Sequence, residues 1–230
     1  MKGVKIGLVG AGNIGQRHIM AIDYLEEAQL IAFADPSEGA HQQARARDIP
    51  CYKSAQEMLE KEALDAVIIA TPTARHFDDV SLCISAGCKH ILVEKPIAAS
   101  DEEAATITYQ AEQAGCSVLV AHQRRYYPCA AKAKELIETG AIGTLIGVTG
   151  QWNCRKDAPY YAPEWRRKTE AGPILTNLIH EIDLLRFICG EIKLVFAHLN
   201  RIDQGFEKED AVAITMQFEN QAVGSFFLSD

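Results

Sequence analysis

The chain has 230 residues, enough for one large domain or two small ones, and 48% of them are hydrophobic, enough to fill a core. Its 31 acidic and 23 basic residues give a formal net charge of -8, and no segment gathers Lys and Arg densely enough to bind nucleic acid. No apolar run approaches the length of a membrane span, and the N-terminal MKGVKIGLVG is too short in its apolar part for a signal sequence. Nucleic acid and membrane are therefore not expected as partners.

Seven cysteines are scattered along the chain without a C-x-x-C pair. This odd number lacks the spacing of a zinc site or of a disulfide framework. We expect reduced thiols in a cytoplasmic protein, and no metal site.

The first half of the chain alternates short apolar runs with longer amphipathic ones. Such alternation predicts βαβ units, hence a doubly wound parallel sheet with helices on both faces. The expected strands cover residues 6–9, 30–34, 66–70, 91–93 and 118–120.

The pattern changes after residue 122, which indicates a second, α+β domain over residues 123–230 beside a first domain over 1–122. Its polar, aromatic segment 153–169 reads as a long loop, and long loops in compact domains are often functional. The chain stops within the last strand, so we expect an open sheet that is incomplete at its C-terminal end. The expected helices cover 130–139 and 175–189, and the expected strands 144–153, 192–199, 212–218 and 223–228, the last two as a hairpin.

A glycine-rich turn follows the first strand. Gly10, Gly12 and Gly15 form G-x-G-x-x-G between the strand KIGLV and a helix, and Asn13 and Ile14 belong to the same turn. In that context Gly10 permits the tight turn, Gly12 lets the backbone approach a pyrophosphate, and Gly15 lets the helix pack on the strand. The helix N-terminus adds unpaired amides for the phosphates. A purely structural glycine turn is the alternative.

Asp35 ends the second strand, where a carboxylate can accept hydrogen bonds from the adenosine ribose. An acid at this position favours NAD, because a 2'-phosphate would meet a like charge. His41 and Arg45, on the following helix, keep NADP possible. Asp35 as the cap of the second helix is the alternative reading.

Three strand ends carry chemically active residues: ATPTARH (70–76), VEKP (93–96) and AHQRRYYP (121–128). Together with the glycine turn and GPILTNLIHEIDLLR (172–186), these segments resemble the Gfo/Idh/MocA oxidoreductases, the family of glucose-fructose oxidoreductase and inositol dehydrogenase. The resemblance covers nearly the whole chain. It implies an N-terminal Rossmann domain and a second domain with a mostly antiparallel open sheet, joined in an NAD(P)-dependent enzyme.

The resemblance gives the VEKP segment a catalytic role. It implies that Lys95 reaches toward the nicotinamide and the reacting hydroxyl, while Pro96 often forms a cis bond that turns the chain. A lysine in a partly desolvated cleft beside a cationic ring can share a proton with a hydroxyl near neutral pH. Glu94 would line the nicotinamide ribose or position Lys95. A surface Glu-Lys ion pair is the alternative.

His180 is the second catalytic candidate. At 3.6 residues per turn, Thr176, Asn177, His180 and Asp183 share one side of their helix, and the opposite side is apolar. The resemblance places His180 at the family's acid-base histidine, which would take the hydroxyl proton or return it. A polar face that simply meets solvent is the alternative. The apolar side comprises Leu175, Leu178, Ile182 and Leu185.

The sequence departs from the family pattern beside His180. Many sugar and inositol dehydrogenases carry an aspartate four residues before this histidine, where the present chain has Thr176, followed by Asn177. A hydroxyl or amide can orient an imidazole but stabilises its charged form less than a carboxylate does. Asp183, one turn beyond, could compensate in part, or serve a structural or substrate role.

Further candidates come from the remaining motifs. Thr71, Pro72 and His76 resemble the family's cofactor-lining segment, although His76 could equally cap or begin a helix. Gln123 is expected to meet the nicotinamide or the substrate.

Two residues of the long loop are expected to close over the substrate. Trp165 and Arg166 offer an aromatic face and a charged fork to a polyol or carboxylate. A structural Trp explains the first of them equally well.

These features predict an NAD-dependent dehydrogenase or reductase that acts on a secondary alcohol/ketone pair of a sugar, cyclitol or related polar metabolite. In this family the second sheet often mediates contacts in a homodimer or homotetramer. The alternative is a dinucleotide-binding sensor that kept the fold and lost turnover, a reading that Thr176 and the abrupt C-terminus favour.

Overall fold

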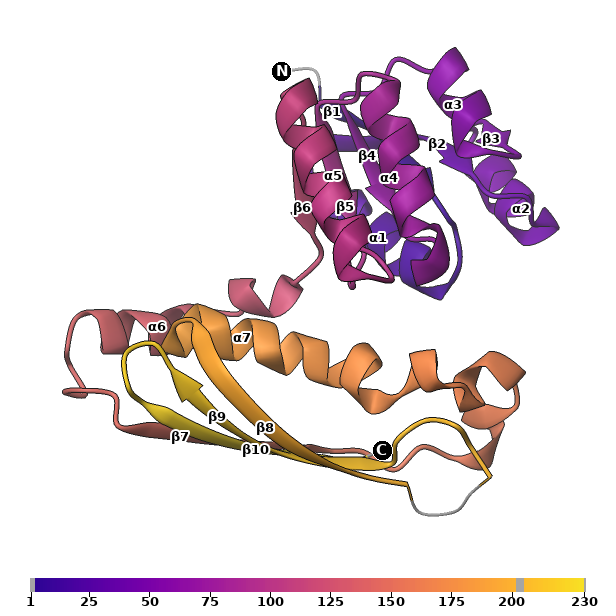
Figure 1. The fold of residues 1–230 in the computed structure, drawn as a ribbon. Coiled ribbons are helices and arrows are strands. Elements are labelled where there is room, and N and C mark those ends of the chain that lie inside the picture. Colours follow the sequence, from indigo (N-terminus) through magenta and orange to yellow (C-terminus); the bar gives the residue numbers. More distant parts are fainter. Residues whose placement is uncertain (1–2, 202–204, 230) are drawn as a thin grey trace. The chain divides into compact units, whose positions relative to one another are not determined.

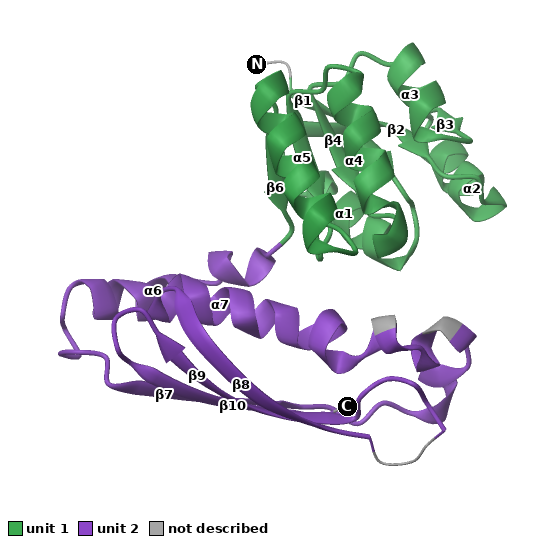
Figure 2. Cartoon of the chain, in the orientation of Figure 1, with its two compact units in different colours: residues 1–121 green, residues 122–230 purple. Residues whose placement is uncertain are grey.

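The computed structural model describes residues 3–201 and 205–229, apart from the side chains of residues 165 and 170. It consists of two compact units, Met1–Ala121 and His122–Asp230 (Figure 2). Across the described ranges, no helix combines the length and apolar character needed to cross a bilayer.

The first unit is built on a six-stranded sheet in the order β3-β2-β1-β4-β5-β6, and all of its pairings are parallel. The doubly wound fold predicted from the sequence is confirmed. Only β3 was not foreseen, since a two-residue strand has no periodicity to detect. The strands are β1 (Val4–Val9), β2 (Ala28–Ala34), β3 (Cys51–Tyr52), β4 (Ala66–Ile69), β5 (His90–Val93) and β6 (Ser117–Val120).

Helices cover both faces of this sheet, so that alternate residues of one strand enter two different cores (Figure 1). Val67 and Ile69 pack with α3, α4 and α5, whereas Ile68 packs with α1 and α2. A strand buried on both faces must be apolar throughout, which explains the uninterrupted apolar runs. The helices are α1 (Asn13–Asp23), α2 (Glu38–Ala46), α3 (Ala55–Lys61), α4 (His76–Ser85, preceded by the 3-10 turn Thr73–Arg75) and α5 (Asp101–Ala114).

The second unit contains a four-stranded sheet in the order β7-β10-β9-β8. The β9–β10 and β8–β9 pairs are antiparallel, and β10 is parallel to β7, which confirms the mostly antiparallel open sheet. Helix α7 packs on one face, where alternate residues of β9 and β10 are buried (Figure 1). The elements are α6 (Pro128–Glu138), β7 (Gly147–Asn153), α7 (Ile179–Cys189), β8 (Ile192–Asn200), β9 (Ala211–Phe218) and β10 (Val223–Ser229).

The helix predicted over 175–189 is interrupted near its start. Ile174–Leu178 forms a π-helical turn, and α7 proper begins at Ile179. The wider turn changes the angular register, so Leu175 is 46% exposed while Leu178 is 1% exposed. The expectation that Leu175 packs on the apolar side was therefore wrong.

The predicted long loop is not without structure. It holds the short 3-10 segments Ala158–Tyr161 and Glu164–Arg167, and a third, Thr169–Ala171, begins at its last residue. Another 3-10 turn, η2 (Gln123–Tyr126), precedes α6.

Gly15 allows a test of the tight contact between α1 and the turn before it. A Cβ at Gly15 would lie 2.2 Å from the Gly10 carbonyl oxygen, whereas one at Gly39 in α2 would meet no atom within 4 Å. We expect Gly15→Ala to destabilise the protein by about 1–3 kcal/mol. Gly39→Ala should instead stabilise it by about 0.5–1 kcal/mol, because alanine restricts the backbone of the unfolded chain and its methyl group meets no clash in the folded helix. Urea unfolding of both variants checks this, and equal midpoints would contradict it.

Candidate functional site

The glycine turn after β1 leaves its backbone open for a ligand. Gly10 has φ +89°, and a Cβ there would come within 2.7 Å of the Ala70 carbonyl oxygen, so only glycine fits. Gly12 caps α1, and a Cβ built on it would meet nothing within 4 Å. Asn13 and Ile14, the first residues of α1, are exposed. A helix N-terminus behind an unobstructed glycine suits a phosphate group.

Asp35 connects this turn to the end of β2. Its Oδ2 accepts the backbone N–H of Ala11 and its Oδ1 accepts that of Ser37, each at 2.8 Å. Partial burial alone would raise the pKa of Asp35, but hydrogen bonds from Ser37 and Ala11 outweigh it, and the net pKa is lowered. The ionised carboxylate keeps acceptor capacity for ribose hydroxyls. Ser37, not Asp35, caps α2 by accepting the N–H of Ala40, so the capping alternative was wrong.

Glu94 and Lys95 follow β5, and a histidine that the sequence reasoning missed fixes the first of them. His18 Nε2 lies 2.9 Å from Glu94 Oε1, and Glu94 Oε2 accepts the backbone N–H of Lys95 at 3.2 Å. Burial raises the pKa of Glu94, yet the hydrogen bond and charge of His18 outweigh it and the net pKa is lowered. His18 lies in α1, three residues after Gly15. Its position close to the glycine turn was the signal in the sequence that could have pointed to this histidine. The Lys95-Pro96 bond is cis, as the resemblance implied.

His76 is a buried bridge between two strand ends. Its Nδ1 lies 2.7 Å from the Pro96 carbonyl oxygen and its Nε2 lies 2.8 Å from that of Thr71. Only 1% of His76 is exposed and α4 begins at this residue, so its ring joins the two strand ends from within the protein. The expected contact of His76 with cofactor is corrected accordingly. Thr71, which precedes Pro72, donates its hydroxyl to buried Asp79 at 2.8 Å.

In the second unit, two ion pairs attach η2 to α7. Arg125 donates from Nε and Nη2 to the two carboxylate oxygens of Asp183, and Arg124 pairs with Glu181. The hydrogen bonds to Asp183 raise the pKa of Arg125. Because the buried Asp183 carboxylate is occupied in this way, we assign it a structural role in place of the expected substrate contact.

His180 lies beside a second histidine that the sequence reasoning did not select. The rings of His122 and His180 meet edge to face, with centroids 6.3 Å apart and planes at 89°. His122 Nδ1 is 3.9 Å from Asp183 Oδ2. Its place in the strand-end segment AHQRRYYP, directly before Gln123, was the available signal.

The residues expected to contact substrate differ in how they are held. Thr176 donates its hydroxyl to the Gly172 carbonyl oxygen at 2.9 Å, and Asn177 donates to Thr176 at 3.2 Å. Arg166 donates to the Tyr160 carbonyl oxygen at 3.0 Å and stacks on the Tyr160 ring. Gln123 is exposed, and the side chain of Trp165 lies outside the described part of the structure.

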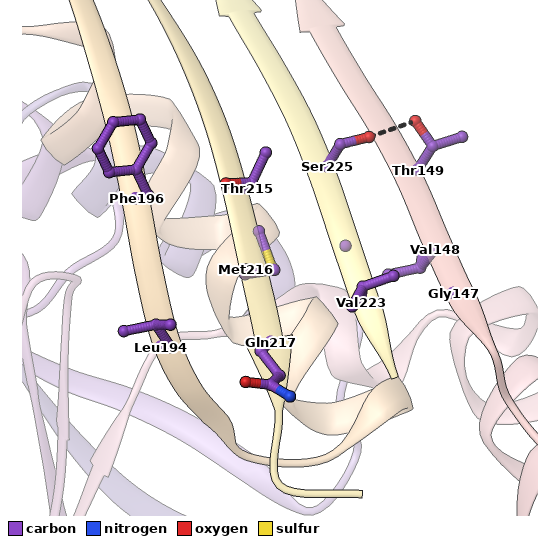
Figure 3. Close-up of a pocket in the computed structure, with 11 residues that line it drawn as sticks. Gly147, Val148, Thr149, Leu194, Phe196, Thr215, Met216, Gln217, Val223 and Ser225 are labelled. Atoms are coloured by element: carbon purple, nitrogen blue, oxygen red, sulfur yellow. Dashed lines mark hydrogen bonds between the residues drawn. The ribbon is translucent and has the colours of Figure 1, made fainter. Parts of the chain in front are cut away.

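A shallow hollow lies elsewhere, on the outer face of the second sheet (Figure 3). It runs across β8, β9, β10 and β7, and no candidate site residue lines it. Among the described residues, no group of three or more His, Cys, Asp or Glu side chains is arranged to hold a metal ion.

Comparison with known families identifies the chain. Residues 4–122 match the GFO/IDH/MocA oxidoreductase family with its NAD-binding Rossmann fold. The chain belongs to this family. Residues 130–230 match a GFO/IDH/MocA C-terminal domain, so both halves of the chain match the same family.

The names of individual relatives indicate different chemistries. The chain is 30% identical to the scyllo-inositol 2-dehydrogenase (NAD(+)) of Bacillus subtilis, over 96% of this chain and 66% of that one. It is 26% identical to the 2,7-anhydro-N-acetylneuraminate hydratase of Escherichia coli, over 94% and 59%. The WlbA dehydrogenase of Bordetella pertussis, solved with NADH and UDP-GlcNAcA, superposes with a TM-score of 0.91 at 27% identity, over 99% and 67%. The chain thus spans about two thirds or less of the length of these relatives.

Proposed function

We propose that the protein is an NAD-dependent dehydrogenase or reductase of a secondary alcohol/ketone pair in a sugar, cyclitol or related polar metabolite. The observation that carries the proposal is the position of Lys95 at the end of β5, in the same parallel sheet as the glycine turn and Asp35. The likeness to an inositol dehydrogenase and to a dehydrogenase solved with NADH supports it. The cysteine pattern, with all seven thiols free, supports a cytoplasmic location.

The residues of the first unit fit a bound dinucleotide. The unobstructed Gly12 and the amides of α1 would hold the pyrophosphate, and Asp35 the adenosine ribose. NAD supplies the acceptor or donor of hydride when it is bound. Thr71 and Pro72 would line the cofactor cleft.

Lys95 and His180 would handle the proton of the reacting hydroxyl. Glu94, held by His18, accepts the backbone N–H of Lys95 and so orients the turn that carries this lysine. His180 would take the hydroxyl proton when hydride leaves and return it in the reverse direction, with Lys95 sharing it. Gln123, Trp165, Arg166 and Asn177 are the proposed substrate contacts.

A hydratase is the second candidate, favoured by the hydratase relative. Such an enzyme would also use an acid and a base, but its product would differ from its substrate by one water instead of two hydrogens. Thr176 in place of the family aspartate favours a third outcome, a sensor without turnover.

Removal of the two proton-handling groups tests the mechanism. We expect Lys95→Ala and His180→Ala each to lower turnover at least 100-fold while NADH binding survives. The assay follows reduced nicotinamide absorbance with scyllo-inositol, myo-inositol and UDP-GlcNAcA. Exposed Lys53→Ala and His90→Ala are the matched controls and should keep wild-type rates. Unchanged turnover in both test variants would remove the mechanism, and NADH binding without turnover by the wild type would favour the sensor.

Asp35 allows a test of the coenzyme preference. We expect wild type to bind NADH more tightly than NADPH, because the 2'-phosphate would face an ionised carboxylate. Asp35→Asn should reduce this discrimination about tenfold, a difference of about 1.4 kcal/mol. Asp48→Asn, which removes one exposed carboxylate in the same unit, should leave it unchanged. Fluorescence titration with both nucleotides measures it, and a wild-type preference for NADPH would contradict the assignment.

The outer face of the second sheet is the proposed contact between copies of the chain. Leu194, Phe196, Val223 and Phe227 are exposed on its strands, and Figure 3 shows the first three of them around the hollow. Apolar surface of this kind favours association into a homodimer or homotetramer. Light scattering should give at least twice the mass of one chain, and Phe196→Glu should reduce it. Tyr109→Glu, an equally exposed aromatic on α5, is the control, and a monomeric wild type would contradict the proposal.

A further inference from the structure

Thr176, four residues before His180, is hydrogen-bonded within its own segment. The Thr176 hydroxyl donates its proton to the Gly172 carbonyl oxygen, and Asn177 donates to the Thr176 oxygen. These bonds tie the hydroxyl to Gly172, just before the π-helical turn, and to Asn177 within it. Many family members carry a carboxylate at this position, and a hydroxyl stabilises a charged imidazole less than a carboxylate does, so the other contacts of the His180 ring bear on its orientation.

Asp183 does not replace that carboxylate directly. Both of its oxygens accept hydrogen bonds from Arg125, and 7% of its side chain is exposed. A bidentate arginine partner fixes a carboxylate in place and offsets its charge. His122 Nδ1 lies 3.9 Å from Asp183 Oδ2.

His122 in turn is held near His180 by the ion pairs between η2 and α7. It is the residue that caps η2, and η2 is attached to α7 by the Arg124–Glu181 and Arg125–Asp183 pairs. Since α7 also carries His180, these ion pairs fix the distance between the two rings. The rings meet edge to face, with centroids 6.3 Å apart.

We infer that His122 is a positioning residue of the proton-handling site, which holds the His180 imidazole and links it to the Asp183 carboxylate. This rests on the proposed function, because it assigns His122 a task through His180. An edge-to-face contact restricts ring rotation, so the imidazole nitrogen keeps one direction toward the substrate hydroxyl. A displacement of about 1 Å in such a group can lower turnover about 100-fold.

Two substitutions at His122 test the role of its ring and the role of its nitrogen atoms separately. His122→Ala removes both, and we expect kcat to fall about 100-fold with KM and NADH affinity within about twofold of wild type. His122→Phe keeps an edge-to-face ring but loses the Nδ1 contact with Asp183, so its kcat should lie between those of the Ala variant and wild type. His90→Phe, the same change at an exposed histidine at the start of β5, should leave kcat unchanged.

A structural readout that needs no substrate accompanies the kinetics. In the full chain with labelled histidines, a nuclear Overhauser cross-peak should join the rings of His122 and His180. The His180 ring resonances should shift in His122→Ala and in His122→Phe, and stay in place in His90→Phe.

The outcomes distinguish this inference from the function on which it rests. If His180→Ala abolishes turnover while His122→Ala and His122→Phe keep the wild-type kcat, the inference is overturned and the function stands. If His180→Ala itself keeps wild-type turnover, both fall. Absence of the cross-peak, or unmoved His180 resonances in both His122 variants, overturns the inference whatever the activity.

Discussion

The parallel pairing of the first sheet is the constraint on which the rest of the structure depends. When all strands run in one direction, their carboxyl ends lie at one edge, and here the loops that leave them carry the candidate site residues of this unit. Hydrogen bonds between those loops then set their spacing. Asp35 joins the end of β2 to the glycine turn, and His76 joins the end of β4 to the segment after β5. Because these groups are wholly or partly buried, each bond is costly to break.

In the second unit, ion pairs set the spacing between the elements that carry the candidate residues. Arg124 and Arg125 attach η2 to α7, and this attachment brings His122 to His180. Both units therefore hold a candidate catalytic group by polar contacts to a neighbouring element. His18 serves Glu94 and Lys95 in the first unit, and His122 is proposed to serve His180 in the second.

Much of the fold could be predicted from the sequence, because apolar periodicity and the G-x-G-x-x-G turn are local signals. Strand β3 was missed because two residues carry no period. The π-helical turn was missed because a helical projection assumes 3.6 residues per turn throughout, which misplaced Leu175.

The candidate site was less predictable, because its supporting contacts join residues far apart in the chain. His18 and Glu94 are separated by 76 positions, and Arg125 and Asp183 by 58. A sequence motif indicates a reactive residue but not the partner that occupies it. For that reason His76 and Asp183 were taken for ligand contacts, whereas their polar atoms are engaged within the protein.

The central claim is that the Lys95 amine and the His180 imidazole act on one hydroxyl beside one nicotinamide ring. A crystal structure of the chain with NADH and scyllo-inositol tests it most directly. The account predicts that both nitrogens lie within hydrogen-bonding distance, about 3 Å, of the same hydroxyl oxygen next to the nicotinamide. Electron density for NADH with Lys95 and His180 in separate, unconnected surroundings would contradict it.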